Sequence, residues 1–309
     1  MLNFEVLKQK IMKAQEDRLN LANFKINPEW FAGFVEAEGG FYTSSKGQPI
    51  FNLSQHMSDW TLMEAISLFL GCGKVAPSIR EDGRPLAVIQ ITNKEALKER
   101  IVPLLEGRIH SLKKTEQFNI WKQTHWGLPK SEAVPLLKEH LNWVAGFVDG
   151  DGAFYFTVHK AKDYKYGYQV KATFDIAQID TEQELLAQIS QLFFNAAHHW
   201  AKSSNTQHMR IVKLSTLLNF VEPSFTGDVL LSRKSLDFIM WQAVLDMMNR
   251  KEHLKEGGIE VILKIRELQR HNRAFIHPSI LNAVMHLRPD LGERLQNKDI
   301  VQTPTSDLT

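Results

Sequence analysis

Two stretches of this chain end in closely spaced carboxylates, the side chains best suited to hold a divalent cation. The first, FAGFVEAEG, carries Glu36 and Glu38, and the second, VAGFVDGDG, carries Asp149 and Asp151. Ligand sets made only of oxygen favour a hard cation such as Mg²⁺. The sequence therefore predicts an Mg²⁺ site where the ends of these two stretches meet.

Both stretches have the composition of an α-helix. Ahead of the first, Asn27 is a capping residue and Pro28 suits the first helical turn. Gly39 suits the left-handed position at which many helices end. The pattern predicts a helix over about 28–38 with Gly39 in the left-handed conformation.

Each helix carries small residues four positions apart, Gly33 with Ala37 and Gly146 with Gly150. Residues at this spacing share one helix face, and two such faces allow backbones to approach closely. We expect the two helices to pack together across a pseudo-twofold axis, with the last acid of each helix side by side. Because acids repel each other at the negative ends of helices, a bound cation would offset their charge.

The same order of elements follows each motif. A strand that carries a glutamine (IFNLSQ or TFDIAQ) leads into an amphipathic helix, an alternating strand (PLAVIQITN or QHMRIVKLS), a short helix, a proline, two cations and a final helix. The N-cap candidates of the amphipathic helices are Ser58 or Asp59, and Asp180 with Gln183. This duplication predicts an α+β fold of two pseudo-symmetric units, each with the element order α-β-β-α-β-β-α-α.

The junctions divide the chain into six segments. THWGLPKSEAVPLLKEH is typical of a linker, and NKDIVQTPTSDLT is typical of a disordered end. We predict an N-terminal extension over 1–27, unit one over 28–123, a linker over 124–138, unit two over 139–248, a C-terminal helical annex over 249–296 and a disordered tail over 297–309.

Composition excludes several classes of protein. With 43% apolar and 23% charged residues, and no long apolar run, the chain reads as globular and free of membrane spans. The N-terminal residues lack the features of a secretory signal, so we expect an intracellular protein. Cys72, the single cysteine, excludes an internal disulfide and a multi-cysteine zinc site. A net charge of +2 does not by itself indicate a nucleic-acid partner.

The two motifs resemble those of the single-chain LAGLIDADG homing endonucleases. The resemblance covers roughly residues 28–275 and includes LGCGKV, the cation pair ahead of a helical phenylalanine, and KEHLKEGGIEVILKI, as in the monomeric organellar-intron branch. It implies two αββαββα units whose antiparallel sheets form a saddle on double-stranded DNA. It also implies a monomeric, metal-dependent endonuclease that cleaves both strands of a long, nearly asymmetric site, located in a mitochondrion or chloroplast if an organelle intron encodes it.

The resemblance also implies three roles for residues that occur once in each unit. These residues are Glu38 and Asp151 as metal ligands, Gln55 and Gln178 as groups that order water, and Lys114 and Lys234 as active-site cations. Lys113 and Arg233 compete for the last role. The expected cofactor is Mg²⁺, with Mn²⁺ or Ca²⁺ as a non-catalytic substitute. Cations held between carboxylates and scissile phosphates can activate water and neutralise the charge that builds on phosphorus.

A two-stranded ribbon fits the major groove of DNA, and its alternate side chains face the bases. Counting by twos selects one face of each sheet as the DNA contact. The selected positions are Ser44, Lys46, Gln48, Ile50, Asn52, Ser78, Arg80 and Gln90 in unit one, and Thr157, His159, Gln169, Lys171, Thr173, Asp175, His208 and Arg210 in unit two. Only 17 residues separate Glu38 from Gln55, against 27 between Asp151 and Gln178, so unit two is expected to reach further along the groove.

Two other functions remain open from the sequence. Proteins of this family can assist splicing of the intron that encodes them, so one alternative is an RNA maturase that binds a group I intron. The other is a DNA-binding protein without nuclease activity, which would be expected to lack one of the last acids. Because Glu38 and Asp151 are both present, the sequence favours cleavage.

Overall fold

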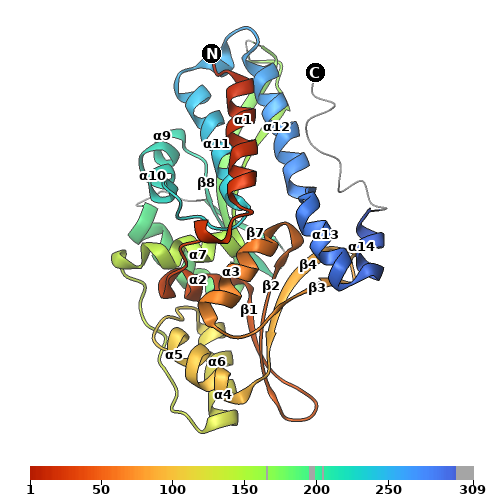
Figure 1. The fold of residues 1–309 in the computed structure, drawn as a ribbon. Helices are drawn as coiled ribbons and strands as arrows, with labels where there is room; N and C mark the ends of the chain where they lie inside the picture. Colours follow the sequence, from red (N-terminus) through yellow and green to blue (C-terminus); the bar gives the residue numbers. More distant parts are fainter. Residues whose placement is uncertain (165, 195–198, 204, 297–309) are drawn as a thin grey trace.

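The computed structural model describes residues 1–296 except 165, 195–198 and 204, and within them the duplicated architecture is clear (Figure 1). Unit one contains α2 (Pro28–Glu38), β1 (Gly39–Thr43), β2 (Pro49–His56), α3 (Trp60–Leu70), β3 (Val75–Ile79), β4 (Pro85–Ile91), α4 (Lys94–Ala96), α5 (Val102–Leu105) and α6 (Leu112–Trp126). Unit two contains α7 (Leu141–Asp151), β5 (Gly152–Lys160), β6 (Tyr168–Ile179), α8 (Gln183–Ile189), β7 (His199–Ser203), β8 (Thr206–Ile211), α9 (Leu214–Thr216), α10 (Glu222–Phe225) and α11 (Lys234–Asn249). The α+β fold of two repeated units is confirmed.

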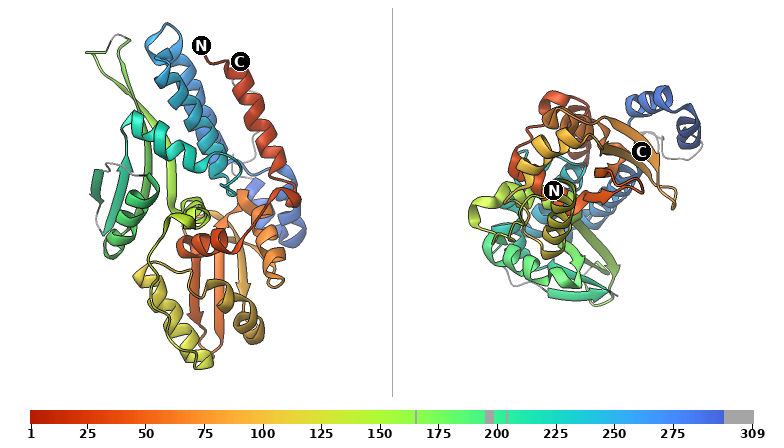
Figure 2. Two further views of the ribbon diagram at one scale, coloured as in Figure 1. Left: turned by 90° about the vertical axis from the view of Figure 1, so that its left-hand side faces the viewer. Right: turned by 90° about the horizontal axis from the view of Figure 1, so that it is seen from below.

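Each unit has one antiparallel sheet of four strands, in the order β1-β2-β4-β3 or β5-β6-β8-β7. Alternation along β2 buries Phe51 and Leu53 on one face and leaves Asn52 and Ser54 half-buried on the other. Along β2 the sheet of unit one therefore has a buried apolar face and a more polar, half-buried face. As expected, the β5–β6 hairpin is longer than the β1–β2 hairpin, and it projects beyond the rest of its unit (Figure 2).

The motif helix of unit one begins and ends as its sequence dictates, with one exception. The Asn27 side chain accepts a hydrogen bond from the Trp30 N–H at 2.9 Å, and Pro28 occupies the first turn. Gly39 is extended, with φ −85° and ψ 156°, so the predicted left-handed conformation is wrong. The glycine is needed for space instead, because a Cβ there would lie 2.6 Å from Cγ1 of Val35.

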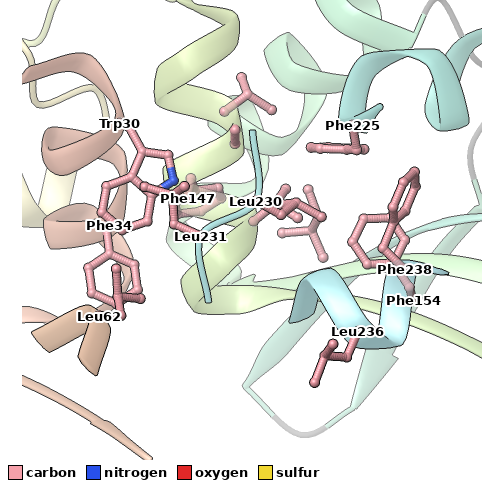
Figure 3. Packing of buried hydrophobic residues seen from close by; sticks show 14 of the residues in the cluster. Trp30, Phe34, Leu62, Phe147, Phe154, Phe225, Leu230, Leu231, Leu236 and Phe238 are labelled. Carbon is pink, nitrogen blue, oxygen red and sulfur yellow. The ribbon is translucent and has the colours of Figure 1, made fainter. Parts of the chain in front are cut away.

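A single apolar core runs through both units. Figure 3 shows Trp30 and Phe34 of α2 close to Phe147 of α7, and the core continues to Phe154 and Phe238 in unit two. Because the two units share this core, their relative position is fixed by packing as well as by the connecting chain.

The extensions add helices beyond the two repeats. They are α1 (Phe4–Asp17), α12 (Gly258–Ala274), α13 (Pro278–Leu287) and α14 (Pro289–Gln296). In Figure 1, α1 and α12 lie beside α11 of unit two, while α13 and α14 lie beside β3 of unit one. No helix in the described part of the chain is long and apolar enough to cross a membrane. The predicted tail, 297–309, lies outside the described residues, and the six segment boundaries stay predictions.

Candidate active site and nucleic-acid interface

The motif helices α2 and α7 touch backbone to backbone. A Cβ added to Gly33 would lie 1.9 Å from the carbonyl oxygen of Trp143, and a Cβ added to Gly146 would lie 1.9 Å from that of Trp30. No side chain larger than hydrogen fits at either position. The two distances are equal, as expected for helices related by a pseudo-twofold axis. The predicted face-to-face packing of the two helices is therefore confirmed.

This packing brings the last acids of the two motifs together. Glu38 ends α2 and Asp151 ends α7, and a Cβ at Gly150 would lie 3.1 Å from Cγ of Glu38. The Gln55 Nε2 donates a hydrogen bond to Oε1 of Glu38 at 3.3 Å. In unit two the Gln178 Nε2 donates to Oδ2 of Asp151. Each acid is therefore oriented by the glutamine of its own unit.

Burial gives these two acids a high affinity for positive charge. Burial and, to a smaller extent, the nearby Asp151 carboxylate together raise the pKa of Glu38 to about 7. Burial also raises the pKa of Asp151 to about 6, against the opposing effect of the Lys234 ammonium. A cation beside the pair would favour the ionised form of both carboxyls.

The donor set suits a metal that is shared with a substrate. No cluster of three or more histidines, cysteines or acids is found among the described residues, so this part of the chain offers two carboxylates. Mg²⁺ usually takes one or two protein carboxylates and completes its shell with water and phosphate oxygens. The two acids fit such an ion.

The predicted basic residues point at the ends of the motif helices. The Lys114 Nζ donates a hydrogen bond to the Gly39 carbonyl oxygen. The Lys234 Nζ donates to the Val148 carbonyl oxygen at 3.0 Å and to that of Gly150. Burial lowers the pKa of both lysines, because an ammonium ion is poorly solvated there.

The alternative cations point elsewhere. Lys113 is exposed, and the Arg233 guanidinium donates to the carbonyl oxygen of Arg273 in α12 at 3.1 Å. The structure therefore brings Lys114 and Lys234, rather than their neighbours, to the paired acids.

The first acid of each motif anchors structure. The Glu36 carboxylate accepts hydrogen bonds from the N–H groups of His110 and Ser111, at 2.9 and 3.3 Å. In unit two Asp149 accepts the equivalent bonds from Leu231 and Ser232, at 2.6 and 3.0 Å. Burial raises the pKa of Glu36 to about 7 and that of Asp149 to about 6.

The strand registers place the predicted DNA-contact positions of the strands on one face of each sheet. Directly paired residues of neighbouring strands point the same way, and Asn52 pairs with Gln90 while Ser78 pairs with Leu86. Ser44, Lys46 and Gln48 belong to the turn that joins β1 to β2. In unit two the pairs Thr157 with Lys171, His159 with Gln169, and Asp175 with Arg210 share the corresponding face.

Two of the predicted contact residues are less exposed than a base contact requires. Thr173 is 3% exposed and Asp175 is 7% exposed. The Asp175 carboxylate accepts a hydrogen bond from Nε of Arg210 at 2.9 Å, and Nδ1 of His208 lies 3.1 Å from its other oxygen. Asp175 therefore orients its neighbours, and Arg210 is the more accessible member of the cluster.

Sequence reasoning missed aromatic residues on the same face. Tyr42 lies two residues before Ser44, so it points to the same face of the sheet, and it is 52% exposed. Tyr155 shares the parity of Thr157, and its hydroxyl lies 3.5 Å from Oδ2 of Asp175. Counting by twos back from Ser44 and Thr157 would have selected both residues.

The comparisons with known proteins agree with this geometry. The sequence model of the LAGLIDADG endonuclease family matches residues 31–125 and 144–245. Probable intron-encoded endonuclease Cox1-I1b of Schizosaccharomyces pombe is 24% identical over 81% of this chain and 71% of its own length. Probable intron-encoded endonucleases 2 and 4 of Neurospora crassa are 27% and 23% identical over 40% and 77% of this chain, which spans only 28% and 43% of their lengths.

Solved structures share the fold. The meganuclease I-AabMI bound to uncleaved DNA superposes with a TM-score of 0.65 at 24% identity, covering 78% of this chain and 98% of that one. I-SmaMI bound to an uncleaved DNA target in the presence of calcium ions gives a TM-score of 0.64 at 21% identity, with coverage of 78% and 98%.

Proposed function

We propose that this chain, which belongs to the LAGLIDADG endonuclease family, is a site-specific DNA endonuclease that hydrolyses one phosphodiester in each strand of a long, nearly asymmetric duplex site. The observation that carries the proposal is the pair of half-buried acids where the ends of α2 and α7 meet. Each acid accepts a hydrogen bond from the glutamine amide of its own unit. A lysine ammonium of each unit donates to a main-chain carbonyl oxygen at the end of the motif helix, that of Gly39 or Gly150, so the same contacts occur in both units. Two sites related by a twofold axis suit the two strands of a duplex.

Glu38 and Asp151 would hold the divalent cation, with Mg²⁺ as the proposed metal. Such an ion would lower the pKa of water and stabilise the leaving oxygen. Gln55 and Gln178 keep the carboxylates oriented through their amide N–H groups. The amide oxygen of Gln55 is already engaged by the His56 N–H at 2.8 Å, which fixes the direction of the amide.

The two lysines supply positive charge at the same place. Because burial lowers the pKa of Lys114 and Lys234, each is a better proton acceptor near neutral pH than an exposed lysine. We propose that both lysines take part in proton movement at the paired acids. Its ammonium form would also help to neutralise charge on the phosphate.

The polar sheet faces are the proposed DNA contact, with bases contacted in the major groove and the scissile phosphates near the ends of the motif helices. Relatives bear the name "intron-encoded endonuclease", and we propose that an intron encodes this chain too, with the mitochondrion or chloroplast as its location. We propose that it acts as a monomer, because the two units already supply both sites. Nothing in the described residues favours the RNA maturase alternative.

A cleavage assay tests the proposal. The protein is incubated with Mg²⁺ and either a randomised duplex library or the host gene without the intron, and the ends of both strands are sequenced. We expect double-strand breaks at one long site, and we expect Glu38→Gln and Asp151→Asn to remove them while DNA affinity stays within about tenfold. The control is Glu64→Gln on α3. Specific binding without any cleavage by the wild-type chain would refute the enzyme proposal.

A further inference from the structure

Two acids outside the motifs occupy the same position in each repeat. Asp59 and Glu182 each lie four residues after the glutamine of their own unit, in the short turn ahead of α3 or α8. Both are buried, with 1% and 3% of their surface exposed. Burying a carboxylate is costly unless it is hydrogen-bonded, so the partners of these two acids identify their role.

The partners of Glu182 lie in the opposite unit. Its two carboxylate oxygens accept hydrogen bonds from the N–H groups of Leu112 and Lys113, at 3.1 and 3.0 Å. These are the first residues of α6, the helix of unit one that carries Lys114. A carboxylate at this end of a helix satisfies free N–H groups and complements the helix dipole.

Asp59 makes the reciprocal contact. Its carboxylate accepts a hydrogen bond from the Arg233 N–H at 2.7 Å, at the start of the unit-two helix that carries Lys234. The Arg18 guanidinium, from the N-terminal extension, donates to the same carboxylate and to the Leu231 carbonyl oxygen at 2.6 Å. Asp59 caps no residue of its own helix, so the predicted N-cap role is wrong.

Carboxylates from both units therefore accept hydrogen bonds at the start of each helix that carries an active-site lysine, α6 with Lys114 and α11 with Lys234. In unit one, the Glu36 carboxylate accepts hydrogen bonds from the N–H groups of residues 110 and 111, and the Glu182 carboxylate accepts those of residues 112 and 113. The Ser111 hydroxyl oxygen accepts the hydrogen bond of the Lys114 N–H. In unit two, the Asp149 carboxylate accepts hydrogen bonds from the N–H groups of residues 231 and 232, and the Asp59 carboxylate accepts that of residue 233. The Ser232 hydroxyl oxygen accepts the hydrogen bond of the Lys234 N–H. Every N–H in these two runs has an acceptor.

We propose that Glu182 and Asp59 are positioning residues that act across the unit boundary, with Glu182 of unit two fixing Lys114 in unit one and Asp59 of unit one fixing Lys234 in unit two. The contacts carry this assignment by themselves. Its catalytic consequence rests on the proposed nuclease function. If each lysine serves one DNA strand, loss of either acid should slow one strand more than the other.

The first test needs no DNA. Backbone amide exchange is measured by NMR or mass spectrometry, and lysine exposure is measured as the rate of acetylation by acetic anhydride at one fixed pH. Glu182→Gln keeps one acceptor oxygen and should speed exchange at residues 112 and 113 by about tenfold, which corresponds to about 1.4 kcal/mol. Acetylation of Lys114 should rise while that of Lys234 stays unchanged.

Asp59→Asn should give the mirror result, with faster acetylation of Lys234 and no change at Lys114. Arg18→Met should resemble Asp59→Asn, because it removes the second partner of the same carboxylate. The controls are Glu184→Gln, an exposed acid on α8, and Glu64→Gln on α3. Equal effects on both lysines, or none on either, would overturn the proposal.

The second test follows each DNA strand separately with an end label. Glu182→Gln should lower kcat on one strand by about tenfold with KM unchanged, so that nicked duplex accumulates. Asp59→Asn should slow cleavage of the opposite strand by a similar factor. Equal slowing of both strands would contradict the cross-unit assignment. If the wild-type chain cleaves no DNA at all, the proposed function fails, while the exchange and acetylation results still decide whether the two acids position the lysines.

Discussion

Replacing Glu38 by glutamine should make the protein more stable at alkaline pH and leave its stability unchanged in acid. In the folded chain the pKa of Glu38 is about 7, raised from 4.5 chiefly by burial and then by the Asp151 charge. Below pH 4.5 the carboxyl is neutral in both folded and unfolded chains, so the amide and the acid behave alike. Above pH 7 the folded chain must hold a poorly solvated charge that the unfolded chain leaves in water.

The size of the effect follows from linkage between protonation and folding. A difference between 4.5 and about 7, at about 1.4 kcal/mol per pH unit, amounts to about 3 kcal/mol at pH 8. For a chain of this length that corresponds to a rise in melting temperature of about 5–10 °C. The gain should grow steadily between pH 4.5 and 7 and then level off.

The assay is thermal and urea unfolding of both proteins at pH 4.5, 6, 7 and 8, in the presence of a chelator so that metal ions do not neutralise the charge. Glu64→Gln, which replaces a carboxylate on α3, is the matched control. A stability difference between Glu38→Gln and the wild type that is the same at every pH would refute the reasoning, since it would mean that the folded and unfolded chains bind the Glu38 proton equally.

Three further predictions concern packing, metal and DNA. Gly33→Ala places a Cβ 1.9 Å from a backbone carbonyl oxygen, so it should lower the free energy of unfolding by about 1–3 kcal/mol or more, and an unchanged melt would contradict the close contact. Protons and metal compete for Glu38, so the Mg²⁺ concentration for half-maximal cleavage should rise as pH falls from 8 to 6, which a titration series measures. Asp175→Asn loosens Arg210 and should relax base preference in a site-selection experiment, whereas Lys46→Ala should lower affinity for all sequences alike and reduce the salt slope by about 0.9.

The sequence was informative wherever function leaves a duplicated or periodic pattern. The packing faces of the two motif helices and the alternating faces of the strands could be predicted from residue spacing within one unit. This is possible because the helix and strand periods determine which residues share a face. The glutamine and lysine positions came from the family resemblance. Asp59 shows where such reasoning stops. Its place ahead of a helix predicts a local N-cap, but its carboxylate turns to the start of a helix that lies 174 residues away in sequence. Only the meeting of the two units reveals that partner.

The paired acids within each motif show how one helix divides two tasks between like side chains. Residues two positions apart lie about 200° apart around a helix, so Glu36 and Glu38 must face different surroundings. Glu36 faces main-chain N–H groups that consume its lone pairs, and it holds the start of the lysine helix in place. Glu38 faces the partner acid, and within the described residues a glutamine amide donates its hydrogen bond. Burial raises the pKa of both acids, but main-chain N–H groups occupy the lone pairs of Glu36, whereas Glu38 accepts its hydrogen bond from a glutamine amide and lies near a like charge. A partly buried acid close to a like charge is one whose ionised form a divalent cation stabilises.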